Sequence, residues 1–241
     1  MAKAKQMNKE GKGEMVRGMF NDIAPTYDRL NHILSLDIDK LWRKRVVRIV
    51  RKLGAKHIMD MATGTGDLAI AMARNIEGST IYGADFSSEM LAVAKQKIEQ
   101  LGLSERISLT ECNAEDIPLE DEAVDVATVA FGVRNFEHQH KALTEMKRTI
   151  RKGGHLVVLE FSNPRCALVR WIYRLYSHYI LPAIGRLVSK HATAYTYLPD
   201  SIDKFASPEE FSALLKEVGF DHIERKSQSM GIAHIYIAHK A

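Results

Sequence analysis

The sequence predicts an α/β fold with a mostly parallel, doubly wound sheet. Short apolar runs alternate with helical segments between residues 57 and 161, the pattern of strand–helix–strand units. A glycine-rich turn, DMATGTGD at 60–67, follows the first apolar run, and two strand-like runs joined around Gly231 close the chain. Because the turn between those two runs is short, they should pair antiparallel. We therefore expect an antiparallel last strand on a sheet that carries helices on both faces.

The individual elements follow in order along the chain. Apolar runs predict strands at 57–62, 79–85, 107–112, 124–130 and 155–161. Helical spacing and glycine stop signals predict helices at 67–75, 87–101 and 137–151, the last ended by Gly153 and Gly154. Ser207, Pro208 and Glu210 make a capping box that begins a helix reaching about Val218. Strands at 222–228 and 232–240 complete the sheet.

The chain organisation predicts one large domain with two helical additions. Residues 1–13 are polar and are expected to be a disordered tail. Residues 14–241 are expected to form a single domain, long enough at 46% hydrophobic composition to bury a full core. Two helices within 14–54, the first interrupted by Pro25 and the second ended by Gly54, form an N-terminal helical cap. A second helical cap is expected at 162–206, inserted before the capping box.

Composition excludes several classes of protein. A net charge of +4 is too mild to indicate a nucleic-acid binder. Cys112 and Cys166 have no CxxC spacing, so we expect free thiols in a reducing compartment. The lysine-containing start has no apolar core of a secretory signal, and no apolar run approaches the roughly 20 residues of a membrane span. These features predict a cytoplasmic protein. His138 and His140 lack an evident third ligand, so no metal site is predicted.

The glycine turn and an acid on the next strand predict a nucleoside-containing ligand. Gly64 and Gly66 allow a ligand to approach the backbone, and Asp85 follows Gly64 by about 20 residues, the place of a carboxylate that binds a ribose diol. Asp60 and Asp67 stand close to the turn and would repel the pyrophosphate of NAD. They favour S-adenosylmethionine, which carries two positive groups. The alternatives are a tight turn without a ligand and, for Asp67, a first-turn acid on the helix dipole.

A second acidic segment follows the third predicted strand. NAEDIP at 113–118 lies where a loop can reach an adenine ring. Asp116 is a candidate acceptor for the exocyclic amine, and Ile117 is a candidate to pack on the ring. A solvated loop is the alternative interpretation.

Several motifs together resemble the ubiquinone/menaquinone biosynthesis C-methyltransferases. They are DMATGTGD, GADFS at 83–87, NAEDIP and FGVRNF at 131–136, and the resemblance covers nearly the whole chain from about residue 15. It implies a class I Rossmann-like methyltransferase that binds S-adenosylmethionine. Thr65, Asp85, Asn113 and Ala114 match the family's cofactor contacts. Ala130 stands where some members have a serine contact, so that contact is not transferred.

The resemblance also implies a polyprenyl quinol as the methyl acceptor. Within the resemblance, the form of the stretch YTYLPDSI (195–202) and the absence of the serine at position 130 favour demethylmenaquinol. This quinol is the acceptor in the last step of menaquinone biosynthesis. The alternatives are a methoxy-polyprenyl-benzoquinol of ubiquinone biosynthesis and another small lipophilic acceptor. An NAD-dependent reductase and a cofactor-binding module without catalysis are alternatives from other classes.

Methylation of a ring carbon requires an ionised hydroxyl, which predicts a cation or a base in the site. Arg134 and Asn135 follow the fourth predicted strand, whose carboxyl end is where such sheets bind ligands. Arginine is a poor base, so we expect it to stabilise the phenolate or to act through a water. A structural salt bridge is the alternative for Arg134. Tyr27 and Asp28 are candidates to close over the cofactor, with helix packing and capping as their alternative.

Residues 161–199 predict a substrate cap that contacts a membrane. The segment has no Asp or Glu, carries Arg165, Arg170, Arg174, Arg186 and Lys190, and is rich in aromatic residues such as Trp171. Anionic lipid attracts such cations, and these aromatic rings suit an interface. We expect peripheral contact with the inner face of the membrane, where a prenyl tail stays in lipid. The alternatives are a cover for the sheet edge and a homodimer contact.

Overall fold

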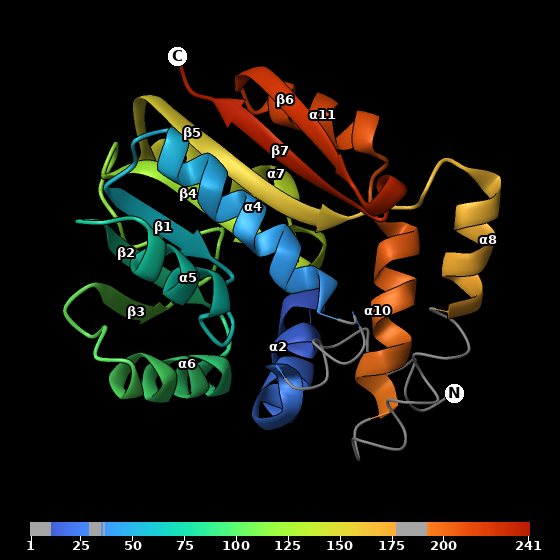
Figure 1. The fold of residues 1–241 in the computed structure, drawn as a ribbon, viewed down its shortest axis with the longest axis horizontal. Helices are drawn as coiled ribbons and strands as arrows, with labels where there is room; N and C mark the ends of the chain where they lie inside the picture. Colours follow the sequence, from blue (N-terminus) through green and yellow to red (C-terminus); the bar gives the residue numbers. More distant parts are fainter. Residues whose placement is uncertain (1–10, 29–34, 36, 177–191) are drawn as a thin grey trace.

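A computed structural model describes residues 11–28, 35, 37–176 and 192–241 of the 241-residue chain. The expectations that fall on residues 1–10, 29–34, 36 and 177–191, including those for Arg186 and Lys190, lie outside the described residues. Seven strands form one sheet in the order β3-β2-β1-β4-β5-β7-β6 (Figure 1). Their bounds are β1 His57–Met61, β2 Thr80–Asp85, β3 Ile107–Glu111, β4 Val124–Ala130, β5 Ile150–Phe161, β6 Asp221–Gln228 and β7 Ala233–His239.

The strand directions confirm the expected fold class. Strands β1 to β5 pair in parallel, and β7 pairs antiparallel with both β5 and β6. The switch point of the sheet lies between β1 and β4, where the chain order reverses. Ligands in open sheets of this kind bind beside such a point, outside the carboxyl ends of the strands.

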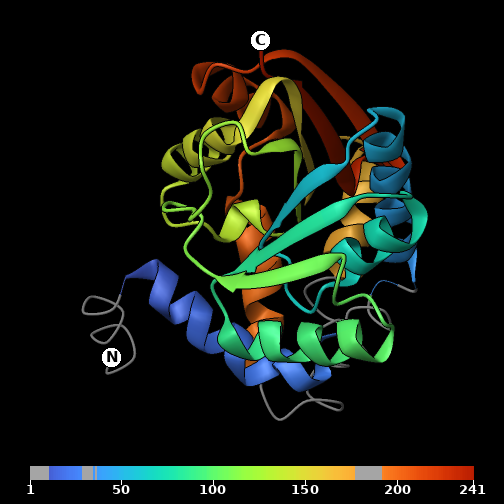
Figure 2. The same ribbon diagram turned by 90° about the vertical axis from the view of Figure 1, so that its left-hand side faces the viewer.

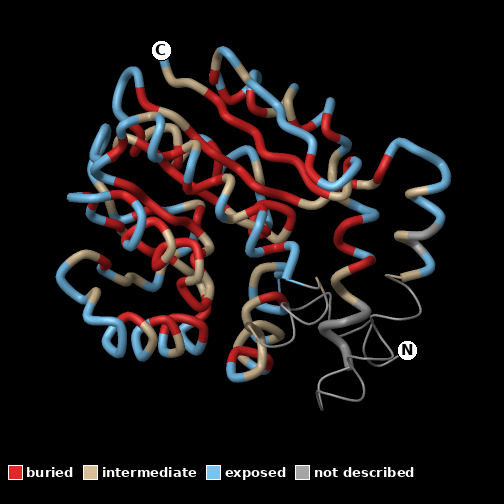
Figure 3. Tube along the Cα trace, in the orientation of Figure 1, coloured by how far each residue is buried: buried red, intermediate tan, exposed pale blue. Residues whose placement is uncertain are grey.

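Helices cover both faces of the sheet because successive strand residues point to opposite sides. Ile58 packs with α4 (Ile38–Lys52), α5 (Asp67–Asn75) and α6 (Ser88–Gln100), whereas Met59 packs with α7 (Gln139–Thr149) and α11 (Pro208–Glu217). Val157 and Val158 of β5 divide in the same way. The buried strands therefore run between two helical layers, as the red trace in Figure 3 shows.

Two helices begin where the sequence predicts, and each has a serine as its N-cap. The Ser207 hydroxyl accepts from the backbone N–H of Glu210, and the Glu210 carboxylate accepts from the N–H of Ser207, at 3.3 and 2.7 Å. Ser87 caps α6 by accepting from the N–H of Met90. The expected starts of these two helices are confirmed.

The boundary between α7 and β5 differs from the expectation. The helix ends at Thr149 rather than Arg151, and β5 begins at Ile150 rather than at residue 155. Val124 pairs with Ile150 but Val126 pairs with His155, so β5 is irregular at Gly153 and Gly154. Gly153 has φ of +75°, a conformation that favours glycine. The two glycines thus form an irregularity inside a strand, which looks like a helix stop in the sequence.

The helices that do not pack on the sheet lie at its carboxyl edge. They are α2 (Lys12–Ile23), followed by a 3-10 turn at Ala24–Thr26, and α10 (Ala192–Lys204), with α8 (Ala167–Leu175) beyond it. Figures 1 and 2 show α2 beside both α6 and α10 at this edge. Helix α2 begins within the expected tail, at Lys12. Helix α4, expected in the N-terminal cap, packs on the sheet because Trp42, Val46 and Val50 bury one face of it.

Candidate functional site

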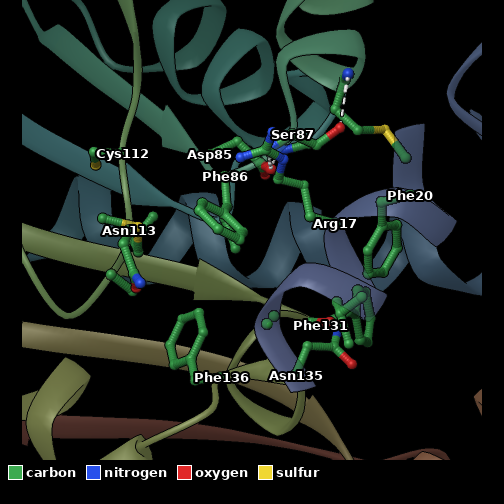
Figure 4. Close-up of a pocket in the computed structure, with 18 of the residues that line it drawn as sticks. Arg17, Phe20, Asp85, Phe86, Ser87, Cys112, Asn113, Phe131, Asn135 and Phe136 are labelled. Carbon is green, nitrogen blue, oxygen red and sulfur yellow. Dashed lines mark hydrogen bonds between the residues drawn. The ribbon is translucent and has the colours of Figure 1, made fainter. Parts of the chain in front are cut away.

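A cavity lies where the carboxyl ends of β1, β2, β3 and β4 meet α2. It encloses about 810 Å³ including the open solvent at its mouth. Figure 4 shows Asp85, Phe86 and Ser87 on one side and Phe131, Asn135 and Phe136 on the opposite side. Most of the surface that lines the cavity is apolar, which suits a ligand with an apolar ring.

The glycine turn forms one wall of the cavity. Gly64 and Gly66 have φ of +58° and +82°, which residues with a Cβ rarely adopt. No atom lies within 4 Å of the position that a Cβ on Gly64 would take, so the backbone is open to a ligand there. A Cβ on Gly66 would lie only 3.2 Å from the Ala94 side chain, which shows how closely the turn packs on α6. Gly64 therefore exposes backbone to the cavity, while Gly66 serves helix packing.

Asp85 joins this turn to the end of β2. One carboxylate oxygen accepts from the Gly64 N–H at 2.7 Å, and the other accepts from the Ser87 N–H at 2.9 Å. Burial raises the pKa of Asp85, and these N–H groups act in the opposite direction. Each carboxylate oxygen can accept a second hydrogen bond, so Asp85 can still accept hydrogen bonds from the hydroxyl groups of a ligand in the cavity.

The other two acids near the turn do not line the cavity. Asp60 is fully buried beneath it, accepts from the hydroxyls of Thr63 and Thr128 at 2.7 and 2.6 Å, and has its pKa raised to about 6 by burial. Asp67 pairs with Lys97 at 2.6 Å. The expectation that these two carboxylates repel a pyrophosphate directly therefore needs correction. The carboxylates that line the cavity in the described chain are Asp85, Glu115 and Glu137.

The loop after β3 reaches the cavity through its first residues. Asn113, Ala114 and Glu115 line the cavity, and the side-chain amide oxygen (Oδ1) of Asn113 accepts from the Glu115 N–H at 3.0 Å. Ile117 instead belongs to the core beneath α7, and Asp116 is exposed outside the lining. A ring against this loop would meet Ala114 rather than Ile117.

Arg134 lies behind the cavity wall, not in it. Its guanidinium pairs with Glu160 at 2.6 Å and also donates to the Phe131 carbonyl and the Ser201 hydroxyl. The side chains of both members of the ion pair are almost completely buried. This is the structural salt bridge that the sequence left open as the alternative role of Arg134.

Asn135 and Tyr27 do line the cavity. Asn135 accepts from the Tyr197 hydroxyl at 3.1 Å, and Tyr27 packs edge to face against Phe20. Thr65 is buried and donates to Asp28, which also pairs with Lys97 at 2.7 Å. Thr65 and Asp28 thus tie the segment after α2 to the turn from outside the lining.

Sequence reasoning missed several residues of the lining. Phe86 and Cys112 directly follow β2 and β3, so the rule that ligands bind at carboxyl ends of strands would have found them. Burial raises the pKa of the Cys112 thiol to about 11, so it stays neutral. The Arg17 guanidinium carbon of α2 lies 5.2 Å from the centroid of the Phe86 ring, a contact that no sequence pattern predicts.

Metal chemistry has no evident site in the described chain. His138 lies 3.0 Å from the Glu115 carboxylate, and no group of three potential metal ligands occurs among the residues described. Within the same residues, no helix is both long and apolar enough to cross a bilayer.

Comparison with known proteins gives the site a family context. The model of the ubiE/COQ5 methyltransferase family matches residues 5–240. Demethylmenaquinone methyltransferase of Bacteroides fragilis is 39% identical over 99% of this chain and 98% of its own. Ubiquinone/menaquinone biosynthesis C-methyltransferase UbiE of Geobacter sulfurreducens is 44% identical over 95% of this chain and 90% of its own. The crystal structure of a SAM dependent methyltransferase from Aquifex aeolicus shares the fold, with a TM-score of 0.55, 19% identity and coverage of 79% and 87%.

Proposed function

The chain belongs to the ubiE/COQ5 methyltransferase family, and on that premise we propose that it transfers a methyl group from S-adenosylmethionine to a ring carbon of demethylmenaquinol. The observation that carries this proposal is the joint placement of Gly64, Asp85 and Ala114 on a cavity whose opposite wall is aromatic. One wall suits a nucleoside with a free diol, and the other suits a flat apolar ring.

The residues present fit S-adenosylmethionine. The open backbone at Gly64 suits the carboxylate end of the ligand, and Asp85 retains acceptor capacity for the two ribose hydroxyls. Ala114 offers an apolar surface to the adenine. Asp85, Glu115 and Glu137 place negative charge around a ligand that carries an ammonium and a sulfonium. Gly66, Thr65 and Asp60 act indirectly by holding the turn in place.

The chemistry requires a quinol oxygen that has lost its proton. A phenol has a pKa of about 10, so the site must favour the ionised form. When bound, S-adenosylmethionine would supply the methyl group to the quinol ring carbon, with cleavage of its carbon–sulfur bond. That ring carbon would then release its proton to solvent and the ring would become aromatic again. The aromatic side chains Phe86, Phe131 and Phe136 exclude water around the reacting atoms. Asn135, whose polar side chain lies on the aromatic wall, would contact the quinol oxygen, and Tyr27 would close the cavity from the α2 side.

Turnover with defined acceptors tests this proposal. We expect a short-chain demethylmenaquinol to be methylated faster than a methoxy-polyprenyl-benzoquinol of equal chain length. By the resemblance described above, alanine rather than serine at position 130 favours the menaquinone branch, and Ala130 lines the cavity. Equal rates would assign both reactions to the protein, and faster benzoquinol turnover would assign it to the ubiquinone branch. Titration with S-adenosylmethionine and NADH separates a methyltransferase from a reductase, because only the former binds the sulfonium ligand.

Helix α8 supports a contact between the protein and the membrane that holds the prenyl tail. Leu168, Trp171 and Leu175 lie three and four positions apart on one helix face and are 65%, 63% and 44% exposed. In Figure 1, α8 stands away from the sheet beyond α10. Arg170 and the acid-free sequence around it add attraction to anionic head groups. We propose that this apolar face enters the surface of an anionic bilayer and brings the mouth of the cavity to the substrate.

Flotation with vesicles of anionic phospholipid tests the membrane contact. The wild-type protein should float with the vesicles, and the variant with Leu168, Trp171 and Leu175 changed to Gln should not. Leu101→Gln, which removes an exposed leucine from the end of α6, is the matched control and should float normally. If the triple variant floats like the wild type, α8 is not the contact. If neither floats, the face should be tested as a homodimer contact by sedimentation.

A further inference from the structure

One wall of the cavity carries an amide whose orientation is set from outside the site. The wall formed by the end of β4 and the segment after it contains Ala130, Phe131, Gly132, Asn135, Phe136 and Glu137. Asn135 and Glu137 have polar side chains, and the Glu137 carboxylate accepts from the Gly13 N–H of α2 at 3.2 Å. A carboxylate repels an ionised oxygen, so a quinol oxygen that faces this wall would meet the Asn135 carboxamide instead.

The two ends of a carboxamide act in opposite ways on an anion. The amide N–H groups stabilise an ionised oxygen, whereas the carbonyl oxygen repels it. The Asn135 carbonyl oxygen accepts from the Tyr197 hydroxyl at 3.1 Å, and the amide nitrogen lies 3.5 Å from the Phe131 carbonyl oxygen. The amide thus has its acceptor end occupied, and the long second contact leaves N–H donor capacity for a ligand.

Tyr197 is itself held by the buried ion pair behind the wall. It lies on α10, and Ser201, one turn further along the same helix, accepts from the Arg134 guanidinium at 3.2 Å. Arg134 is fixed by Glu160 at the end of β5. Burial raises the pKa of Tyr197, so its hydroxyl keeps its proton and remains a donor. The ion pair therefore positions α10, and α10 positions the hydroxyl that orients Asn135.

We propose that Tyr197 is a positioning residue for methyl transfer: its hydroxyl holds the Asn135 carboxamide so that the amide N–H groups face the ionised oxygen of the quinol. This inference rests on the proposed function. It gives the inserted helix α10 a direct effect on the chemistry, although Tyr197 itself does not line the cavity. It also gives a role to a buried ion pair, Arg134 with Glu160, that lies behind the wall without lining the cavity.

A double-mutant cycle with pH profiles tests this role. Tyr197→Phe should lower kcat with the quinol about 5-fold to 10-fold and leave the affinity for S-adenosylmethionine unchanged. Because a lost donor raises the pKa of the bound quinol, the rising limb of the pH–kcat profile should move to higher pH. Asn135→Ala should produce a similar or larger loss. Adding Tyr197→Phe to Asn135→Ala should then have no further effect.

Tyr173→Phe is the matched control, since Tyr173 also lies in the electrostatic environment of Arg134 and Glu160. It should keep the wild-type pH profile. Additive losses in the double variant, or an unmoved pH profile in Tyr197→Phe, would overturn the inference while the proposed function stands. A wild-type protein that methylates no quinol would overturn both.

Discussion

The two walls of the cavity are built in different ways. The glycine-turn wall comes from strand ends and tight turns: Asp85 is the last residue of β2, and Gly64 and Ala114 lie three residues after the ends of β1 and β3. The opposite wall depends on contacts between distant segments. Asn135 meets Tyr197 across 62 residues, and Lys12 of α2 donates to the carbonyl of Phe136 across 124.

The difference between the two walls suggests a division of roles, in which the glycine-turn wall binds the cofactor and the opposite wall affects the reaction. The glycine-turn wall needs only the backbone and one carboxylate, and it suits a ligand shared by many methyltransferases. In the proposed function, the opposite wall and α2 would contact the acceptor, and α10 would support that wall from behind. Substitutions in the first wall should therefore act on cofactor affinity, and those in the second on stability or turnover.

The largest effect is expected at Arg134. Replacing it with alanine leaves the buried Glu160 carboxylate unpaired, which should lower the free energy of unfolding by about 3–5 kcal/mol. Urea unfolding measures this loss. The pair substitution Arg134→Met with Glu160→Gln should recover most of it, because no buried charge remains. An Arg134→Ala protein of normal stability that no longer turns over would instead restore the catalytic role expected from the sequence.

Asp85 should show the main effect on the cofactor. Asp85→Ala should weaken binding of S-adenosylmethionine by about 1–3 kcal/mol, since the ribose hydroxyls lose a buried acceptor. Isothermal titration measures the affinity. Asp116→Ala is the matched control because this acid lies outside the lining and should leave affinity unchanged. A loss in Asp116→Ala would return that residue to the role first expected for it.

Asp60 should make stability depend on pH beneath the glycine-turn wall. Its pKa is raised from 3.8 to about 6, chiefly by burial, so the folded state holds this proton more tightly than the unfolded state. The wild type therefore loses stability through this residue as pH rises from about 4 to about 6. Asp60→Asn does not ionise and should be about 2–3 kcal/mol more stable than the wild type above this window.

Urea unfolding of the wild type and Asp60→Asn across the same pH window isolates this one residue from all other titrating groups. The difference between the two proteins should grow with pH and then level off. A difference that stays constant with pH would show that Asp60 is not the group responsible.

The smallest effect is expected where α2 meets the glycine-turn wall. The side-chain amide oxygen (Oδ1) of Asn21 accepts from the Ser87 hydroxyl at 2.6 Å, so Asn21→Ala removes one hydrogen bond between α2 and the glycine-turn wall. We expect S-adenosylmethionine to dissociate a few times faster, in keeping with about 0.5–1.5 kcal/mol for one hydrogen bond. Stopped-flow displacement measures this rate. Asn75→Ala on α5 is the control, and equal rates in both variants would mean that α2 does not retain the ligand.

The elements predicted most closely have strong local signals. Helix α5 occupies the expected residues because Gly66 and Asp67 mark its start, and the strands follow clear apolar runs. The α7–β5 boundary was predicted wrongly because two glycines inside a strand look the same in sequence as glycines that end a helix. The role of Arg134 needed its partner, and Glu160 at the end of the apolar run HLVVLEF was a signal that could have revealed it. A carboxylate buried in such a strand requires a cation nearby.

The amino-acid order alone was enough for the sheet, the glycine turn and Asp85. Strand alternation and positive φ angles depend on neighbouring residues, and parallel strands bring their carboxyl ends together at one edge. The order alone was not enough for the opposite wall. Which face of α2 covers the cavity, and which tyrosine of α10 meets Asn135, depend on how separate elements pack. Close packing brings together side chains that are distant in sequence, and which of them meet depends on how their shapes fit. These contacts can therefore be identified only in the folded protein.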